Sequence, residues 1–188
     1  MGYSVPEIAR MTKFPKTTVY NHIKNVKMPE DIFKEWKAKR GGSKIIKILK
    51  EKQALNSAKK LIKTLSNKER LLFMSALYWA EGNKKDFMLS NTDPYLIRFY
   101  VDSLRKIFGI KNEDLKISIR VYEDINTDDA LKFWSKLINL PQDSFQNIYI
   151  LHGKKQGKLK YGMCRVRVAK GGDYLKQVTA IYKTVANF

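Results

Sequence analysis

Ten consecutive residues without a charge, Leu71 to Ala80, constrain the fold of this chain more than any other segment. In a protein with 29% charged residues, such a run is typical of an element that is buried for most of its length. The run ends abruptly at Glu81, so residues 74–82, MSALYWAEG, place one carboxylate at the end of an apolar helix. We therefore expect the last turn of this helix to lie beside a group that favours an anion.

Length and charge indicate a folded protein with a polyanionic partner. A chain of 188 residues makes one large domain or two small ones, and 44% apolar residues supply an ordinary core. The 37 basic against 18 acidic residues leave a net charge of +19, which repels itself in a compact fold unless a polyanion neutralises it. Nucleic acid is the leading partner, and an anionic membrane surface is the alternative.

Other composition features exclude several classes of protein. No stretch reaches the roughly 18 apolar residues of a membrane span, and the N-terminal residues lack a signal-peptide pattern. We therefore expect a cytoplasmic protein, associated with the nucleoid in a prokaryote. The single cysteine, Cys164, excludes an internal disulfide, and two histidines are too few for a structural zinc site. Cys164 lies in an alternating run typical of a buried strand.

Charge and helix-start signals divide the chain into three parts. Residues 1–65 carry 16 basic and 5 acidic residues, whereas 66–188 carry 21 and 13. A break near Gly41-Gly42-Ser43 and the capping pattern S-x-x-E at Ser66 mark two boundaries. The predicted parts are an all-α domain at 1–40, a basic helical linker at 41–66 and an α+β domain at 67–188. The linker is either a solvated helix or a helix that lies along phosphates.

The C-terminal part alternates between strand and helix patterns. Alternating apolar runs predict strands, while Pro or acidic residues at their starts and Gly at their ends mark helices. The predicted strands are 86–90, 116–122, 147–151 and 161–168, the last two forming a hairpin around a basic loop, and the predicted helices are 94–109, 127–140 and 173–185. The acidic residues at 127–129 are interpreted as a helix start and not as a second metal site.

Two short helices joined by a tight turn are predicted at residues 4–23, SVPEIARMTKFPKTTVYNHI. Ala9 is small enough to let the helices approach, and Pro15 starts the second helix where a missing N–H costs little. This stretch resembles the helix-turn-helix of resolvase-type DNA-binding domains, with Lys13 at a turn position where glycine is common. The expected apolar contacts are Val5, Ile8, Phe14, Val19 and Ile23.

The helix-turn-helix resemblance implies that the second helix faces the major groove or its flanking phosphates. The residues that would do so are Lys16, Thr17, Thr18, Tyr20, Asn21 and Lys24. Asn21 is the candidate reader of adenine, and the lysines would chiefly add salt-dependent affinity. The alternative is a structural three-helix domain whose polar face meets only water.

The uncharged helix resembles a nine-residue family signature. Aligned without gaps, MSALYWAEG is similar to LAGLIDADG, which names a family of homing endonucleases and their non-cleaving relatives. Ser75 and Ala76 are small, Leu77, Ala80 and Gly82 match, Glu81 is the second acid, and Trp79 replaces the first. A SNTDP start at 90–94 and a Phe-Gly-Ile end at 108–110 extend the resemblance to roughly 67–188. It implies a mixed α+β domain with an antiparallel sheet, acting as a homodimer because the signature occurs once.

The signature also implies a site for chemistry. Small Ser75, Ala76 and Ala80, with Trp79, would form the dimer interface and bring two helix ends together. Each end places a Glu81 carboxylate beside carbonyl oxygens at the negative pole of its helix. Because two carboxylates repel each other, a site at Glu81 and Gly82 predicts Mg²⁺ or another hard divalent cation. Such ions activate water for phosphodiester hydrolysis, so Glu81 is the candidate catalytic residue.

Double-stranded DNA is the implied partner, although only residues 83–90 stand where the family has a DNA-contacting pair of strands. The candidate phosphate contacts on the sheet are Lys116, Ser118, Arg120, Arg165 and Arg167, with Lys158 and Lys160 in the hairpin loop. Two functions stay open: a Mg²⁺-dependent, site-specific DNA endonuclease, and a non-cleaving transcriptional regulator that kept the fold. RNA binding is a third option, without a recognisable module such as an aromatic RNP strand.

Overall fold

The computed structural model describes residues 3–27, 29–40, 42–155 and 157–188. The chain folds as two compact units, Met1–Lys63 and Thr64–Phe188, divided close to the boundary expected at about residue 66. None of the helices in the described ranges is long and apolar enough to cross a membrane.

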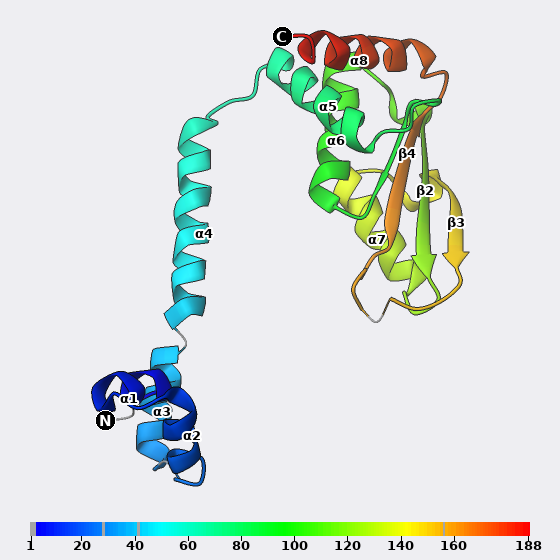
Figure 1. The fold of residues 1–188 in the computed structure, drawn as a ribbon. Helices are drawn as coiled ribbons and strands as arrows, with labels where there is room; N and C mark the ends of the chain where they lie inside the picture. Colours follow the sequence, from blue (N-terminus) through cyan, green and yellow to red (C-terminus); the bar gives the residue numbers. More distant parts are fainter. Residues whose placement is uncertain (1–2, 28, 41, 156) are drawn as a thin grey trace. The chain divides into compact units, whose positions relative to one another are not determined.

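The described elements of the N-terminal unit are all helical (Figure 1). They are α1 (Val5–Thr12), α2 (Lys16–Ile23), α3 (Glu30–Arg40) and α4 (Gly42–Leu61). Glu7 accepts hydrogen bonds from the backbone N–H and the hydroxyl of Ser4, which fixes the start of α1. Ala9 and Val19 are buried where α1 packs on α2. Of the break predicted at residues 41–43, Gly41 lies outside the described residues, whereas Gly42 and Ser43 begin α4.

Helix α4 takes up most of the predicted linker. Every side chain that the structure describes between Lys44 and Leu61 is exposed, and Ile45, Ile48 and Leu55 are each more than half exposed. Apolar side chains in water contribute no burial energy. Within its unit, α4 therefore forms no core.

The C-terminal unit is an α+β domain, as the sequence predicts. Its elements are α5 (Asn67–Glu81), β1 (Met88–Asn91), α6 (Pro94–Phe108), β2 (Leu115–Tyr122), α7 (Thr127–Ile138), β3 (Phe145–Leu151), β4 (Met163–Val168) and α8 (Gly172–Val185). The strands form one sheet in the order β1-β4-β2-β3. Helices α6 and α7 pack on one face of it, α5 packs on α6 and β1, and α8 packs on α5 (Figure 1).

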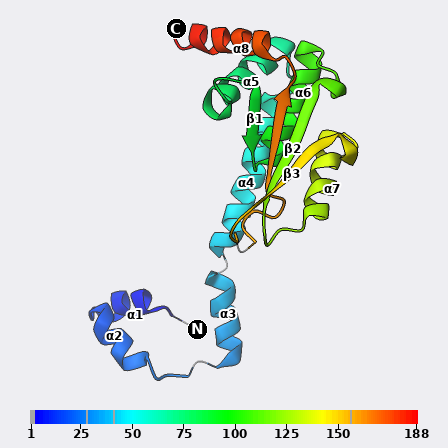
Figure 2. The ribbon, with the colours of Figure 1, turned by 90° about the vertical axis from the view of Figure 1, so that its right-hand side faces the viewer.

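The predicted hairpin of the last two strands is wrong, and the sheet is not antiparallel throughout. β3 pairs in parallel with β2, whereas β4 pairs antiparallel with both β1 and β2. The cause is α7, because a helix between two strands returns the chain to its starting end and makes the next strand parallel. After β3, the chain returns as β4 between β1 and β2 (Figure 2).

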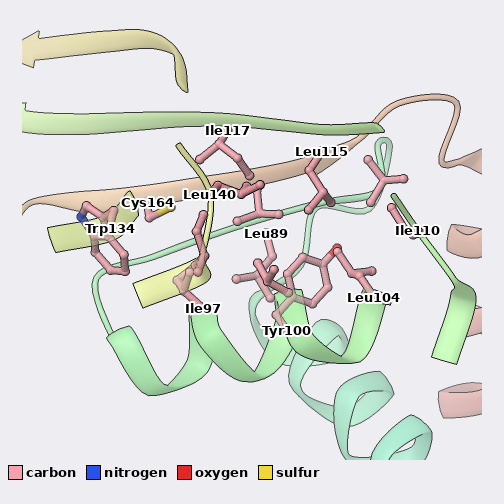
Figure 3. Packing of buried hydrophobic residues seen from close by; sticks show 14 of the residues in the cluster. Leu89, Ile97, Tyr100, Leu104, Ile110, Leu115, Ile117, Trp134, Leu140 and Cys164 are labelled. Carbon is pink, nitrogen blue, oxygen red and sulfur yellow. The ribbon is translucent and has the colours of Figure 1, made fainter. Parts of the chain in front are cut away.

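The core lies between the sheet and the helices. Alternate residues of β2 are buried, and they meet Ile97, Tyr100 and Leu104 of α6 (Figure 3). Cys164 of β4 is buried among them, as predicted, and burial raises the pKa of its thiol. Since side chains alternate across a strand, the basic residues of β2 and β4 point to the other face, which no helix of the C-terminal unit covers (Figures 1 and 2).

The helix starts follow local rules. Asp93 accepts from the N–H of Tyr95 at 2.8 Å, with Pro94 in the first turn of α6. Asn126 accepts from the N–H of Asp129 at 2.9 Å, so the acidic residues at the start of α7 belong to a helix N-terminus, as predicted.

Candidate nucleic-acid interface and the end of helix α5

Helix α5 is buried on one side only. Met74, Ser75 and Tyr78 are buried, whereas Phe73 and Trp79 are 54% and 50% exposed. The expectation that the uncharged run is buried for most of its length is therefore wrong for a single chain. The reason is geometric, because α6, β1 and α8 together leave one side of a helix that is apolar all round uncovered.

The exposed side of α5 is a continuous apolar face. It consists of Leu72, Phe73, Ala76, Trp79 and Ala80, which share one side at helical spacing. Helix α8 borders this face, where the rings of Trp79 and Tyr182 stack at 5.2 Å with 2° between their planes. A pocket of ≈ 170 Å³ between the two helices is lined by Leu72, Ser75, Ala76, Trp79, Ile181, Tyr182 and Val185. We call these exposed α5 residues the α5 face.

One residue predicted for the dimer interface does not lie on the α5 face. Ser75 is 1% exposed, and its hydroxyl has no hydrogen-bond partner among the described residues. Ser75 points between α5 and α8 because it stands on the core side of Ala76. Of the predicted interface, Ala76, Trp79 and Ala80 are accessible.

Tyr78 holds the turn that follows α5. Its buried hydroxyl lies within donating distance of the carbonyls of Asn83 and Asp86, and accepts from the N–H of Met88 at 3.2 Å. Burial raises the pKa of Tyr78 to about 12, so the phenol stays neutral and able to donate. The turn is thereby folded back against the helix end.

Gly82 is required by close packing against Tyr78. A Cβ at this position would lie 2.5 Å from the Tyr78 carbonyl oxygen and 2.6 Å from its ring. The Gly82 N–H donates to the same carbonyl at 2.8 Å, and Gly82 pairs with Leu89 as an isolated bridge. The glycine of the signature therefore has a structural role in this chain.

Lys84 lies at the negative pole of α5. Its ammonium donates to the carbonyl of Tyr78 at 3.0 Å and to that of Trp79 at 2.6 Å. A cation on the last carbonyls of a helix stabilises its C-terminus. These two oxygens, expected to be free near the metal site, are therefore bound by the chain's own lysine.

Glu81, the last residue of α5, is exposed and held from one side. The Asn91 side-chain N–H donates to its carboxylate at 3.2 Å. The Asn91 side-chain Oδ1 accepts a hydrogen bond from the backbone N–H of Asp93 at 2.9 Å. This bond sets the orientation of the Asn91 side-chain amide. The carboxylate thus has a fixed neighbour and an open side.

One copy of the chain does not make up a metal site. Within the described ranges, no group of three or more His, Cys, Asp or Glu residues gathers. Glu81 supplies a single carboxylate, Gly82 only backbone, and Lys84 already binds the nearest carbonyls. Mg²⁺ prefers about six oxygen ligands, so a site here requires a second copy, phosphates or both.

The open face of the sheet carries a row of polar side chains. By strand register, Ser90, Arg165, Ser118 and Asn147 stand side by side on β1, β4, β2 and β3. The Arg165 Nε is buried without a hydrogen-bond partner in the described chain. An unpaired guanidinium nitrogen favours an incoming acceptor such as a phosphate oxygen.

The other sheet residues predicted to contact phosphates differ in how free their side chains are to do so. Arg167 stands beside Lys116 in the sheet, but its guanidinium is paired with the Asp86 carboxylate. The Lys116 ammonium lies 3.4 Å from the Glu113 carbonyl oxygen, and Ser118 is only 7% exposed. Exposed and half-exposed basic groups remain at Arg120 and, in the loop before β4, at Lys158 and Lys160.

Two tyrosines on this face were missed by sequence reasoning. Tyr122 follows Arg120 on the open side of β2, and Tyr149 is the register partner of Arg120 on β3. The Arg120 guanidinium lies 5.9 Å from the Tyr149 ring centroid, and the Lys155 ammonium lies 4.6 Å from that of Tyr122. Alternation along β2 is a signal for Tyr122, whereas Tyr149 depends on the parallel pairing.

In the N-terminal unit, the turn between α1 and α2 has the expected tight form. Lys13 takes a left-handed conformation, φ 60°, at the position where glycine is common. The predicted α2 contacts Lys16, Thr17, Tyr20, Asn21 and Lys24 are all exposed and share one side of the helix.

Two residues of the predicted helix-turn-helix do not lie where the sequence predicts. Thr18 is half-buried and lines a pocket of ≈ 270 Å³ with Ile8 and His22, because it stands on the opposite side of α2. Phe14, expected among the apolar contacts, is 61% exposed. It borders the same pocket without closing it.

Comparisons with protein-family models, with curated proteins and with solved structures find no match for this chain.

Proposed function

We propose that this protein binds double-stranded DNA in a sequence-specific manner. The observation that carries the proposal is the helix pair α1–α2, whose second helix exposes Lys16, Asn21 and Lys24 along one side. A helix of this kind enters the major groove, where an asparagine reads adenine and lysines contact phosphates. The open sheet face, with Arg120 and Arg165, supplies a second basic surface for the same polyanion.

The α5 face supports a homodimer. A two-fold interface must be self-complementary, and Ala76 and Ala80, one helical turn apart, leave room for a second α5 to approach. Phe73 and Trp79 flank them with large exposed apolar surface, which a partner copy removes from water. A dimer also doubles the number of DNA-reading helices, as symmetric DNA-binding proteins do.

DNA cleavage is the second candidate function, and Glu81 favours it. Its carboxylate stands exposed at the C-terminal end of α5, where Asn91 donates to it from one side. In a dimer joined through α5, two such carboxylates and DNA phosphates would hold Mg²⁺ or another hard cation. When bound, that ion would activate water for phosphodiester hydrolysis. Glu81 would supply a ligand oxygen, and Asn91 orients the Glu81 carboxylate. The non-cleaving regulator is the same molecule without this step.

Selection from a random duplex library tests DNA recognition. We expect wild-type protein to enrich a defined site, and Asn21→Ala to lose preference at one base pair by about 5- to 150-fold. Asn25→Ala is the matched control, since Asn25 is also exposed but follows α2. No enrichment by wild type, or equal effects of both variants, contradicts the proposal.

Cleavage is tested separately with a plasmid library and Mg²⁺. Cuts made by wild type and not by Glu81→Gln establish the nuclease. Selective binding by both proteins without nicking assigns the regulator.

A further inference from the structure

The open sheet face ends in an aromatic patch, defined here as Arg120, Tyr122, Tyr149 and Lys155. The two tyrosines come from neighbouring strands, β2 and β3, at positions that point away from the core. Tyr149 is 43% exposed and lies on an edge strand, so one side of this patch is open to a long ligand.

Each ring of the aromatic patch has a cation beside it. The Arg120 guanidinium lies over Tyr149 at 5.9 Å, and the Lys155 ammonium lies over Tyr122 at 4.6 Å. A cation at one part of a ring leaves its remaining surface for stacking and supplies a contact for phosphate. Rings and cations alternate here, as they do in grooves that bind unpaired nucleotides.

The nearby carboxylates bind the backbone of the loop after β3. Glu123 accepts from the N–H of Gly153 at 3.3 Å and contacts His152 at 3.0 Å. Asp124 accepts from the backbone N–H of Lys155 at 3.1 Å. Both acids hold the loop after β3 and thereby position Lys155, whose side chain stays exposed.

We infer that the aromatic patch binds unpaired bases of a nucleic-acid strand by stacking on Tyr122 and Tyr149, with Arg120 and Lys155 contacting the phosphates. Duplex DNA keeps its bases stacked on one another, so the rings fit a single strand or a locally opened duplex. Every base has a π face, so stacking on these rings does not require a particular base sequence. The inference goes beyond the duplex recognition proposed for α2 and does not depend on it.

Two oligonucleotides of equal charge separate stacking from attraction by charge alone. One is a thymidine strand of about 20 nucleotides, longer than the roughly 4–16 nucleotides of one small binding domain. The other has the same backbone with abasic sites throughout. In fluorescence anisotropy at fixed salt, the full chain should bind the thymidine strand about 30-fold more tightly than the abasic strand. This factor is the lower end of the range expected when two bases stack on aromatic rings.

Variants identify the rings that stack. Tyr122→Leu/Tyr149→Leu should bind both strands with the affinity that wild type has for the abasic one, whereas the corresponding double Phe variant should keep the full preference. Tyr95→Leu, which removes another exposed tyrosine, is the control. Equal binding of the two strands by wild type overturns the inference, as does a preference that survives in the double Leu variant.

The outcome is distinct from that of the proposed function. Asn21→Ala should alter duplex selection and leave the thymidine-to-abasic ratio unchanged. A wild-type protein that selects no duplex but retains the ratio refutes the helix-turn-helix proposal and supports the patch. Circular dichroism of the double Leu variant checks that it is folded, since both rings lie on the face away from the core.

Discussion

Replacing Lys84 with methionine tests the electrostatics at the end of α5, because its neighbour Lys85 provides a matched control. The Lys84 ammonium donates to two carbonyls at 3.0 and 2.6 Å. The Lys85 side chain makes no hydrogen bond or ion pair among the described residues, and only its N–H is used, by Asn83. Methionine keeps the unbranched stem that packs near the Tyr78 ring and removes the charge.

The magnitude follows from the exposure of Lys84. A cation at a helix C-terminus contributes about 0.3–1 kcal/mol, and hydrogen bonds to charged groups contribute about 1.5–3 kcal/mol where water is excluded. Lys84 is exposed, so water replaces most of the second contribution when the lysine is lost. We expect Lys84→Met to lower the free energy of unfolding by about 1 kcal/mol, and Lys85→Met by less than about 0.5 kcal/mol.

Urea unfolding of the full chain measures this difference. Trp79 and Trp134 report on the C-terminal unit when Trp36 is replaced by Phe in all variants. The loss in Lys84→Met should shrink as KCl rises, because exposed charges are screened. Equal losses in the two variants, or a loss that salt does not change, would refute the assignment of Lys84 to the helix end.

Three further predictions concern the same helix. The pKa of Tyr78 is raised from 10.0 to about 12 in the folded state, so its contribution to stability is full below about pH 10 and lost as pH rises towards 12; Tyr78→Phe should flatten this fall in alkaline unfolding curves. Gly82→Ala forces a Cβ against the Tyr78 backbone and should cost about 3 kcal/mol in urea unfolding, whereas a cost below 1 kcal/mol would show that the turn adapts. Ala76→Arg places a charge on the α5 face and should convert a dimer to monomer in sedimentation, with Lys85→Met unaffected.

Local signals predicted most of the helices in the C-terminal unit. The start of α6 was predicted from Asp93 and Pro94, and its end from Gly109, which has φ 64°. The start of α7 followed from the acidic residues at 127–129. These signals work because a capping side chain bonds to N–H groups only two or three residues away, and left-handed glycine ends a helix without help from distant residues.

Strand pairing required information that is not local. The β3 and β4 segments each contain alternating apolar residues and are separated by a basic loop, a pattern typical of a hairpin. The α7 crossover makes β3 the parallel partner of β2. β4 pairs between β1 and β2, a position that exists only in the assembled sheet. The aromatic patch was missed for the same reason, since Tyr149 meets Arg120 only when β3 pairs with β2.

The sequence predicted the position of Glu81 at a helix end, but not the Lys84 ammonium that lies beside it. The uncharged run and Glu81 placed a carboxylate at a helix end, which α5 has. No local pattern indicates that Lys84 folds back to the carbonyls of Trp79 and Tyr78, five and six residues earlier in the chain. That contact depends on the Tyr78 hydroxyl holding the turn. The uncharged run was expected to be buried for most of its length, whereas one side of α5 is exposed. This exposed apolar side favours the proposed partner copy.

Lys84 also separates the two candidate functions by their need for metal. In the proposed dimer, two copies joined through α5 would bring together two Glu81 carboxylates and two Lys84 ammonium groups, so the paired ends would carry no net charge from these residues. Assembly then needs no divalent cation, and a cation becomes favourable only when DNA phosphates add negative charge. We therefore expect sedimentation in EDTA and in Mg²⁺ to give the same dimer, with Mg²⁺ required for cutting alone. A dimer that forms only with Mg²⁺ would mean that Lys84 does not neutralise the helix end.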